Sequence, residues 1–220
     1  MQNSLWHIIL LILCWILYFF IHSATASVPV KQWVIFKWPN FAPKYRLTYN
    51  ILAVVLVVPP AWLMYSYQGP LLIQWQGAVF WLVNFIAVLA VLAFFWSLQY
   101  YDTQEFLGTK QWRHQSATID DQAGFRLSPL HRYVRHPLYF FALIVVWTRN
   151  MDLARLVTSI AITLYFIIGS RLEEKKLIDL FGEVYWKYKQ LVPGLFPLPW
   201  RYLSRNDAKQ ILASHARNDQ

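Results

Sequence analysis

The sequence is poor in cysteine, glycine and charge. One cysteine and seven glycines occur among 220 residues, and charged side chains make up 14%. A single cysteine excludes a disulfide framework. The scattered glycines form no G-x-G-x-x-G motif, so nothing supports a dinucleotide-binding Rossmann domain. The sequence also contains no His, Cys and Asp cluster with metal-ligand spacing, and we expect no metal site.

Apolar and aromatic residues are abundant instead. Hydrophobic residues make up 57% of the chain, with 12 Trp, 13 Tyr and 15 Phe, and a soluble domain of this size could not easily hide that much apolar surface. The net charge of +9 suits a nucleic acid or a membrane surface. The composition favours the membrane, so we expect membrane lipids and no nucleic acid as partners.

Five apolar stretches predict an all-α, polytopic integral membrane protein with about five transmembrane helices, near residues 5–21, 47–67, 78–98, 135–148 and 153–170. A helix needs ~20 residues to cross the hydrocarbon core. The fourth stretch reaches only about 21 Å at ~1.5 Å per residue, so we expect it to tilt, to thin the bilayer or to form a partial hairpin with the fifth. Residues 1–200 are interpreted as one membrane domain, and 201–220 as a basic interfacial tail.

Lysine and arginine are distributed unevenly around these stretches. Residues 23–46 carry four, 99–136 five and 171–220 nine, whereas none precedes the first stretch or lies between the second and third. This bias predicts an N-terminus outside and a cytoplasmic C-terminal helical segment. The alternative is a signal peptide cleaved near Ala24-Thr25-Ala26. The absence of Lys and Arg ahead of the first apolar run disfavours it.

Polar residues gather in two further stretches, 127–139 and 170–197. In the first, Pro137 suits the first turn of a helix. Arg135 and His136 then lie beside unpaired backbone N–H groups, which form a natural anion site, and Tyr139 begins the apolar run. The alternative interpretation is a snorkelling arginine and an interfacial tyrosine.

The second polar stretch predicts a helix with one marked face. That face carries a carboxylate, two apolar residues and two tyrosines, at Glu174, Ile178, Phe181, Tyr185 and Tyr188. Gly182 interrupts it, which favours a bend or two short helices. The alternative is an amphipathic helix on the membrane, with Glu173 as a solvated partner of Lys176. Its lipid-facing lysines would be Lys175, Lys176, Lys187 and Lys189.

Together the two stretches form a candidate pocket if they meet at one end of a helical hairpin. The side chains suit a cofactor with a carboxylate, a ribose and a cation. Arg135 and the helix start can hold the carboxylate, and Glu174 can accept hydrogen bonds from ribose hydroxyls. Tyrosine faces favour a sulfonium or ammonium group.

These stretches resemble the isoprenylcysteine carboxyl methyltransferase superfamily of integral membrane methyltransferases. The shared pattern is R-H-P-x-Y and, after a span pair, E-E-x-x-L-x-x-x-F-G-x-x-Y-x-x-Y-x-x-x-V-P-x-x-x-P. Here it reads Arg135, His136, Pro137 and Tyr139, then Glu173, Glu174, Leu177, Phe181, Gly182, Tyr185, Tyr188, Val192, Pro193 and Pro197. The N-terminal half is more similar to the NnrU and methanethiol S-methyltransferase branch, through His22, Ser23, Lys31, Gln32, Trp33, Glu105, Gly108, Gln111 and Trp112.

The resemblance implies S-adenosylmethionine as methyl donor and a lipophilic or small apolar methyl acceptor, in a bacterial inner membrane. It implies Arg135 and Glu174 as catalytic residues. The implied cofactor-binding residues are His136, Tyr139, Glu173, Glu174, Tyr185 and Tyr188. Displacement at a methyl group needs little acid–base help when the acceptor is a thiolate or carboxylate, so positioning and desolvation carry most of the catalysis.

Two other functions are compatible with the sequence. Phe141 stands where family members usually have glycine, which favours a non-catalytic membrane protein with an inherited fold. The second alternative function is that of a membrane reductase, because sterol reductases resemble this superfamily at the C-terminus. Those reductases are larger, however, and bind a dinucleotide phosphate. A thiol, a prenyl-cysteine carboxylate and a lipid amine all fit as acceptors, and any oligomeric state fits.

Overall fold

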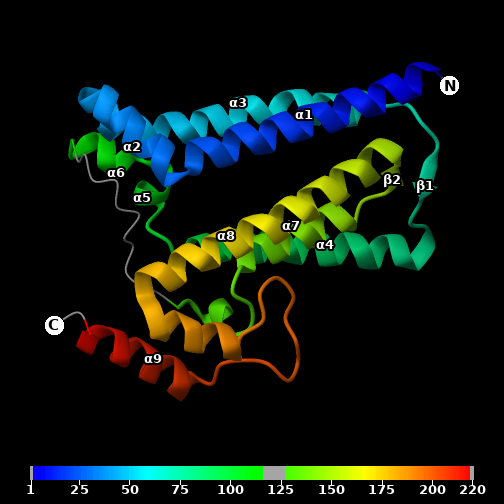
Figure 1. Cartoon of the computed structure of the whole chain (residues 1–220). Coiled ribbons are helices and arrows are strands. Elements are labelled where there is room, and N and C mark those ends of the chain that lie inside the picture. The colour runs from blue at the N-terminus through cyan, green and yellow to red at the C-terminus, as the bar shows by residue number, and fades with distance from the viewer. Residues whose placement is uncertain (1, 116–126, 219–220) are drawn as a thin grey trace. The chain divides into compact units, whose positions relative to one another are not determined.

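The computed structural model describes residues 2–115 and 127–218, and almost all of their regular structure is helical (Figure 1). The helices are α1 (Gln2–Ala26), α2 (Val28–Lys37), η1 (Pro39–Lys44), α3 (Tyr45–Ser66), α4 (Gly77–Leu98), α5 (Thr103–Leu107), α6 (Thr109–Arg113), η2 (Pro129–Arg132), α7 (Pro137–Trp147), α8 (Leu153–Leu191) and α9 (Arg205–Asn218). Two short strands, β1 (Leu71–Ile73) and β2 (Met151–Asp152), pair antiparallel. The all-α prediction is confirmed.

In the part of the chain that the structure describes, four helical segments are long and apolar enough to cross a membrane, at Ser4–Ala26, Pro39–Ser66, Gly77–Leu98 and Leu153–Leu191. The predicted first, third and fifth spans fall within them, and the second, 47–67, ends one residue beyond Ser66. Helix α7 has 11 apolar residues, about 16 Å at ~1.5 Å per residue, against a hydrocarbon core ~30 Å thick. The prediction of about five spans therefore becomes four long helices and one short one.

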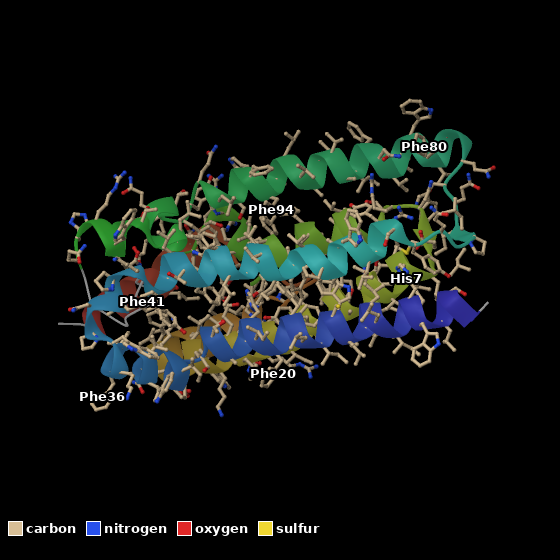
Figure 2. The ribbon with its side chains drawn as sticks, turned by 90° about the horizontal axis from the view of Figure 1, so that it is seen from above. His7, Phe20, Phe36, Phe41, Phe80 and Phe94 are labelled. Carbon is tan, nitrogen blue, oxygen red and sulfur yellow. The ribbon has the colours of Figure 1, made fainter. Side chains whose placement is uncertain are left out.

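The chain forms two compact units. The first comprises α1, α2, η1, α3, the two strands, α5, α6 and the start of α8, and the second comprises α4, η2, α7, the rest of α8 and α9. In the first unit α1 runs alongside α3, and His7 of α1 has its Nε2 2.7 Å from the carbonyl oxygen of Leu63 in α3 (Figure 2). The indole of Trp15 donates to the Thr158 hydroxyl at 3.0 Å.

In the second unit α7 packs against both α4 and α8. Small buried residues on α4, Ala87 and Ala90, allow close helix approach in a membrane. The indole of Trp147 at the end of α7 donates to the Thr163 hydroxyl of α8 at 3.0 Å. Helices α7 and α8 therefore form the hairpin that the sequence suggested.

Helix α8 changes character along its length. Residues 153–170 carry one charged side chain, whereas residues 171–191 carry nine, so only the first part suits the hydrocarbon core. The helix then breaks at Gly182, whose φ of 55° and ψ of −133° suit only glycine. The predicted interruption is confirmed, and the part after Gly182 turns back into the core of the unit, where Tyr185, Tyr188, Val192, Leu203 and Ala208 pack together.

Candidate functional site

The segment before α7 is paired with the segment after α8. Pro137 begins α7 with His136 as its N-cap residue, in agreement with the prediction, because the missing proline N–H costs nothing at a helix start. The backbone N–H groups of Arg135 and His136 donate to the carbonyl oxygens of Pro193 and Gly194, at 2.9 and 3.1 Å. The two polar stretches that the sequence singled out therefore meet.

Arg135 uses its whole guanidinium group within the protein. Its Nε donates to Glu174 Oε1 at 2.7 Å, and its Nη2 lies 2.6 Å from the same oxygen. Its Nη1 donates to the carbonyl oxygens of Lys189, at 2.9 Å, and of Val192. The carboxylate that the structure pairs with Arg135 is thus Glu174 itself, and not a ligand as the sequence suggested.

Glu174 is the centre of a buried charge cluster. Besides Arg135, its Oε1 lies 3.1 Å from His136 Nε2 and its Oε2 3.1 Å from Lys189 Nζ, with the side chain 5% exposed. It belongs to the charged part of α8, outside the apolar span. Burial acts to raise its pKa, but the His136 hydrogen bond and the Arg135 charge outweigh burial and lower the pKa from 4.5 to about 2. Glu174 is therefore ionised throughout the physiological range.

His136 lies between two carboxylates. Its Nε2 is 3.1 Å from Glu174 and its Nδ1 is 3.4 Å from Glu173 Oε2. Burial opposes protonation, yet the hydrogen bonds with both glutamates prevail and raise the pKa of His136. The site therefore stabilises an imidazolium with a donor on each nitrogen.

The two adjacent glutamates have different surroundings. The Glu173 side chain is 49% exposed, and the Tyr139 hydroxyl donates to its Oε2 at 3.5 Å. Glu173 is therefore the carboxylate that can reach a ligand, whereas the sequence assigned the ribose hydroxyls to Glu174. Its partners His136 and Tyr139 belong to the other polar stretch, so Glu173 is not simply the solvated partner of Lys176.

A row of stacked rings connects this polar site to the apolar part of the hairpin. His136 stacks with Tyr139 at 5.4 Å between ring centroids, and Tyr139 stacks with Phe166 of α8 at 4.4 Å. The sequence analysis missed Phe166, although it precedes Glu173 by two helical turns and so shares its face. It also missed Lys189, which one alternative directed to lipid headgroups and which instead pairs with Glu174.

Tyr185 and Tyr188 lie beneath the site in the core of the unit. Each is 2% exposed, and their rings meet edge to face at 5.7 Å. The Tyr188 hydroxyl donates to the carbonyl oxygen of His131 at 2.7 Å. Burial and the nearby Glu174 charge raise the pKa of Tyr185. Their part in cofactor binding stays a prediction, and the structure gives Tyr188 a supporting contact.

The motif residues of the N-terminal half lie in the first unit. Gly108 has a φ of 85°, and a Cβ there would lie 2.5 Å from the backbone nitrogen of Leu47, so only glycine fits. Asn50 Nδ2 donates to the carbonyl oxygens of Phe106 and Leu107 at 3.0 and 3.1 Å. His22 Nε2 lies 2.8 Å from the Tyr49 hydroxyl. These contacts connect α5 and α6 to α3, and α1 to α3.

The exposed side of the site presents groups that suit an organic ligand. Within residues 2–115 and 127–218 no group of three or more His, Cys, Asp or Glu side chains could hold a metal ion. The half-exposed Glu173, the Tyr139 hydroxyl and the row of rings offer an anionic acceptor beside an apolar wall. Such a set suits a ligand with hydroxyl groups and a positive charge.

Comparison with known proteins identifies the class. A "Methanethiol S-methyltransferase" of a Pseudomonas species is 35% identical over 193 residues, covering 80% of this chain and 68% of the relative. Proteins of the same name are 32% identical in Pseudomonas deceptionensis, over 86% of this chain and 71% of that one, and 30% identical in Mycobacterium tuberculosis, over 82% and 74%. No family model and no solved structure matches the chain.

The apolar helices, the charged site at the end of a hairpin and these relatives define an integral membrane methyltransferase. The chain belongs to the methanethiol S-methyltransferase family, the branch that its N-terminal half resembles. An enzyme is therefore favoured over a non-catalytic protein or a reductase. The chain departs from the usual motif at Phe141, whose ring lies 5.4 Å from that of Phe140.

Proposed function

We propose that the protein transfers a methyl group from S-adenosylmethionine to a small thiol at the membrane boundary, with methanethiol as the first candidate. The observation that carries the proposal is the half-exposed Glu173, held by His136 and Tyr139 where the apolar hairpin ends. The relatives, which are methanethiol S-methyltransferases by name, support the choice of a thiol.

The overall reaction is a displacement at carbon. S-adenosylmethionine supplies a methyl group activated by a positively charged sulfur. A lone pair of the thiolate forms the new carbon–sulfur bond, and the old bond breaks with its electron pair going to the sulfonium sulfur. The thiol proton passes to water, since the thiolate is the nucleophile. The chain's contribution is to position both reactants and exclude water.

We assign the ligand contacts to the exposed side of the site. In this proposal Glu173 and the Tyr139 hydroxyl bind the ribose hydroxyls, and the Glu173 charge favours the sulfonium. Arg135, Glu174 and Lys189 are bound to one another and to backbone carbonyls, so we propose that Arg135 and Glu174, the predicted catalytic pair, position the site. Tyr185 and Tyr188 support it from the core.

The distribution of lysine and arginine supports an orientation. We propose that the N-terminus lies outside and that the site opens to the cytoplasm, because residues 99–136 and 171–220, which contain most of the site, carry five and nine basic residues. We further propose a bacterial inner membrane as the location, which the bacterial relatives support, with residues 1–200 as one membrane domain and 201–220 as an interfacial tail.

Cofactor binding is tested by calorimetric titration of S-adenosylmethionine and S-adenosylhomocysteine into detergent-purified protein. We expect binding to the wild type and a loss of about tenfold or more in Glu173→Gln, since a hydrogen bond to a charged group contributes roughly 1.5–3 kcal/mol. The matched control is Asp179→Asn, an exposed carboxylate on the same helix. A folded wild type that binds neither compound would refute the proposal.

The acceptor is tested separately by product analysis. Purified protein in lipid nanodiscs is supplied with the methyl donor and methanethiol, and the headspace is analysed for dimethyl sulfide by gas chromatography. Parallel reactions receive longer alkyl thiols, a prenyl-cysteine and a lipid amine. Methylation of the carboxylate or amine, with none at sulfur, would contradict the thiol assignment and leave the cofactor assignment intact.

A further inference from the structure

The loop that follows the site, residues 195–202, displays large aromatic side chains. Trp200 is 76% exposed, Phe196 54% and Tyr202 55%. Aromatic surface of this extent is unfavourable in water, and tryptophan and tyrosine are enriched where a membrane meets water. The loop contains no acidic residue and includes Arg201, with Arg205 just beyond it.

The loop presents Trp200 on a rigid support. The backbone N–H of Arg201 donates to the carbonyl oxygen of Leu198 at 3.0 Å, which closes a tight turn with Pro199 and Trp200 at its tip. The Arg201 guanidinium donates to the Gln190 carbonyl. Leu203 exchanges two hydrogen bonds with Arg132, backbone to backbone at 2.8 Å and through Arg132 Nε at 2.9 Å. The outward position of Trp200 is thus fixed by the fold.

The same loop is joined to the site and to the start of the short helix. Its entry carries the carbonyl oxygens of Pro193 and Gly194 that accept from Arg135 and His136. The ring of Phe196 lies 6.3 Å, edge to face, from that of Phe140 in the first turn of α7. Helix α7 is apolar and begins at Pro137, directly after the two residues that bind the loop entry. The loop is therefore attached to the end of an apolar helix.

We infer that Phe196, Trp200 and Tyr202 insert into the headgroup region of the bilayer, with Arg201 and Arg205 beside anionic lipid headgroups. This aromatic anchor would hold the entrance of α7, and with it Glu173, at the bilayer surface where an apolar acceptor dissolves. The inference concerns the membrane contact of the loop and does not depend on the identity of the methyl donor or acceptor.

Fluorescence in lipid nanodiscs tests the anchor. In the full chain with Cys14→Ser, Trp200→Cys is labelled with an environment-sensitive fluorophore, in phosphatidylcholine containing roughly 30% phosphatidylglycerol. We expect blue-shifted emission that lipids with a spin label near the headgroup quench. The matched control, Glu183→Cys on the exposed surface of the same unit, should give red-shifted, unquenched emission. Phe196→Cys serves as a second probe if Trp200→Cys does not yield monodisperse protein.

Two outcomes would overturn the inference. Red-shifted, unquenched emission at position 200, as expected for position 183, would show that the loop faces water. A blue shift without lipid quenching, growing with the number of protein molecules per nanodisc, would show that a second copy covers the loop. If Arg205 binds anionic headgroups, lipid quenching of the label at position 200 should be weaker after Arg205→Gln. Equal quenching with and without this substitution would exclude a role for Arg205 in the anchor. None of these readouts requires methyl transfer, so failure here is distinguishable from failure of the proposed function.

Discussion

Two ion-pair clusters in this protein use similar side chains at similar distances but differ in burial. In the second unit, Arg135 lies 2.6 Å from Glu174, and their side chains are 10% and 5% exposed. In the first unit, Lys110 lies 2.8 Å from Asp102 and 3.3 Å from Glu105, on the surface. Water screens the surface cluster, whereas loss of a partner in the buried one leaves an uncompensated charge. Burial, rather than distance, should set the energetic weight of each cluster.

The largest expected effect follows removal of the Arg135 guanidinium. Arg135→Met leaves the ionised Glu174 without its closest partner and should cost about 3–5 kcal/mol of stability. The melting temperature of the detergent-purified protein, followed by circular dichroism, measures the loss. Arg171→Met, at an exposed arginine, is the control. Equal melting temperatures for the two variants would show that the buried Arg135 contributes no more to stability than an exposed arginine.

The second largest effect of the buried cluster is expected in the pH dependence of stability. The folded-state pKa of Glu174 is depressed from 4.5 to about 2, so its stabilisation is fully present above about pH 4.5 and disappears as the pH falls toward 2. The pKa of His136 is raised above 6.5, so its stabilisation is full below pH 6.5 and disappears as the pH rises through the raised value. The melting temperature should therefore decrease both toward acidic pH and toward alkaline pH.

Variants separate the two limbs of this profile. Glu174→Gln should flatten the acidic limb, and His136→Asn the alkaline one. An acidic limb that Glu174→Gln leaves unchanged would mean that other carboxylates determine acid stability.

Crowding of the buried cluster should have a smaller effect. A Cβ at Gly194 would lie 3.3 Å from Arg135 Nη2 and 3.8 Å from Glu174 Oε1. Gly194→Ala should therefore push on the ion pair and lose about 1 kcal/mol. Gly169→Ala is the matched control, because its Cβ would meet nothing within 4 Å and alanine favours a helix. If the Gly194→Ala protein is as stable as Gly169→Ala, the Arg135 guanidinium can move away from the added methyl group without loss of stability.

The smallest effect is expected on the surface. Lys110→Met removes the partner of Asp102 and Glu105, but water can solvate both carboxylates, and exposed pairs contribute little. We expect no measurable change in melting temperature at moderate salt. A clear decrease would indicate that the surface cluster is coupled to the packing of α5 and α6.

Much of the fold follows from local features of the sequence. The four long apolar segments, Pro137 at the start of α7 and the break at Gly182 were all predictable, because each depends on length, hydropathy or the backbone limits of one residue type. The meeting of the two polar stretches was expected from a hairpin of the spans between them. The shortness of α7 was visible too, although it was counted among the spans.

The roles within the site were harder to predict. From the sequence, Glu174 was expected to bind a ligand, and one interpretation directed Lys189 to lipid headgroups. The structure instead pairs these two side chains with each other. The sequence put Tyr188 on the same helical face as Glu174 and also predicted an interruption at Gly182. It did not give the direction of the chain after the break, which the structure turns so that Tyr188 packs in the core.

The sequence by itself determined that this chain is a helical membrane protein with a charged motif at the end of a hairpin, because hydropathy and helix-breaking residues act locally. Only the tertiary structure decided which of two adjacent glutamates is buried. Neighbouring residues on a helix point in directions about 100° apart, and their surroundings depend on segments distant in sequence. Here Arg135 and His136, directly before α7, and Lys189 near the end of α8 surround Glu174, whereas the Glu173 side chain stays half-exposed.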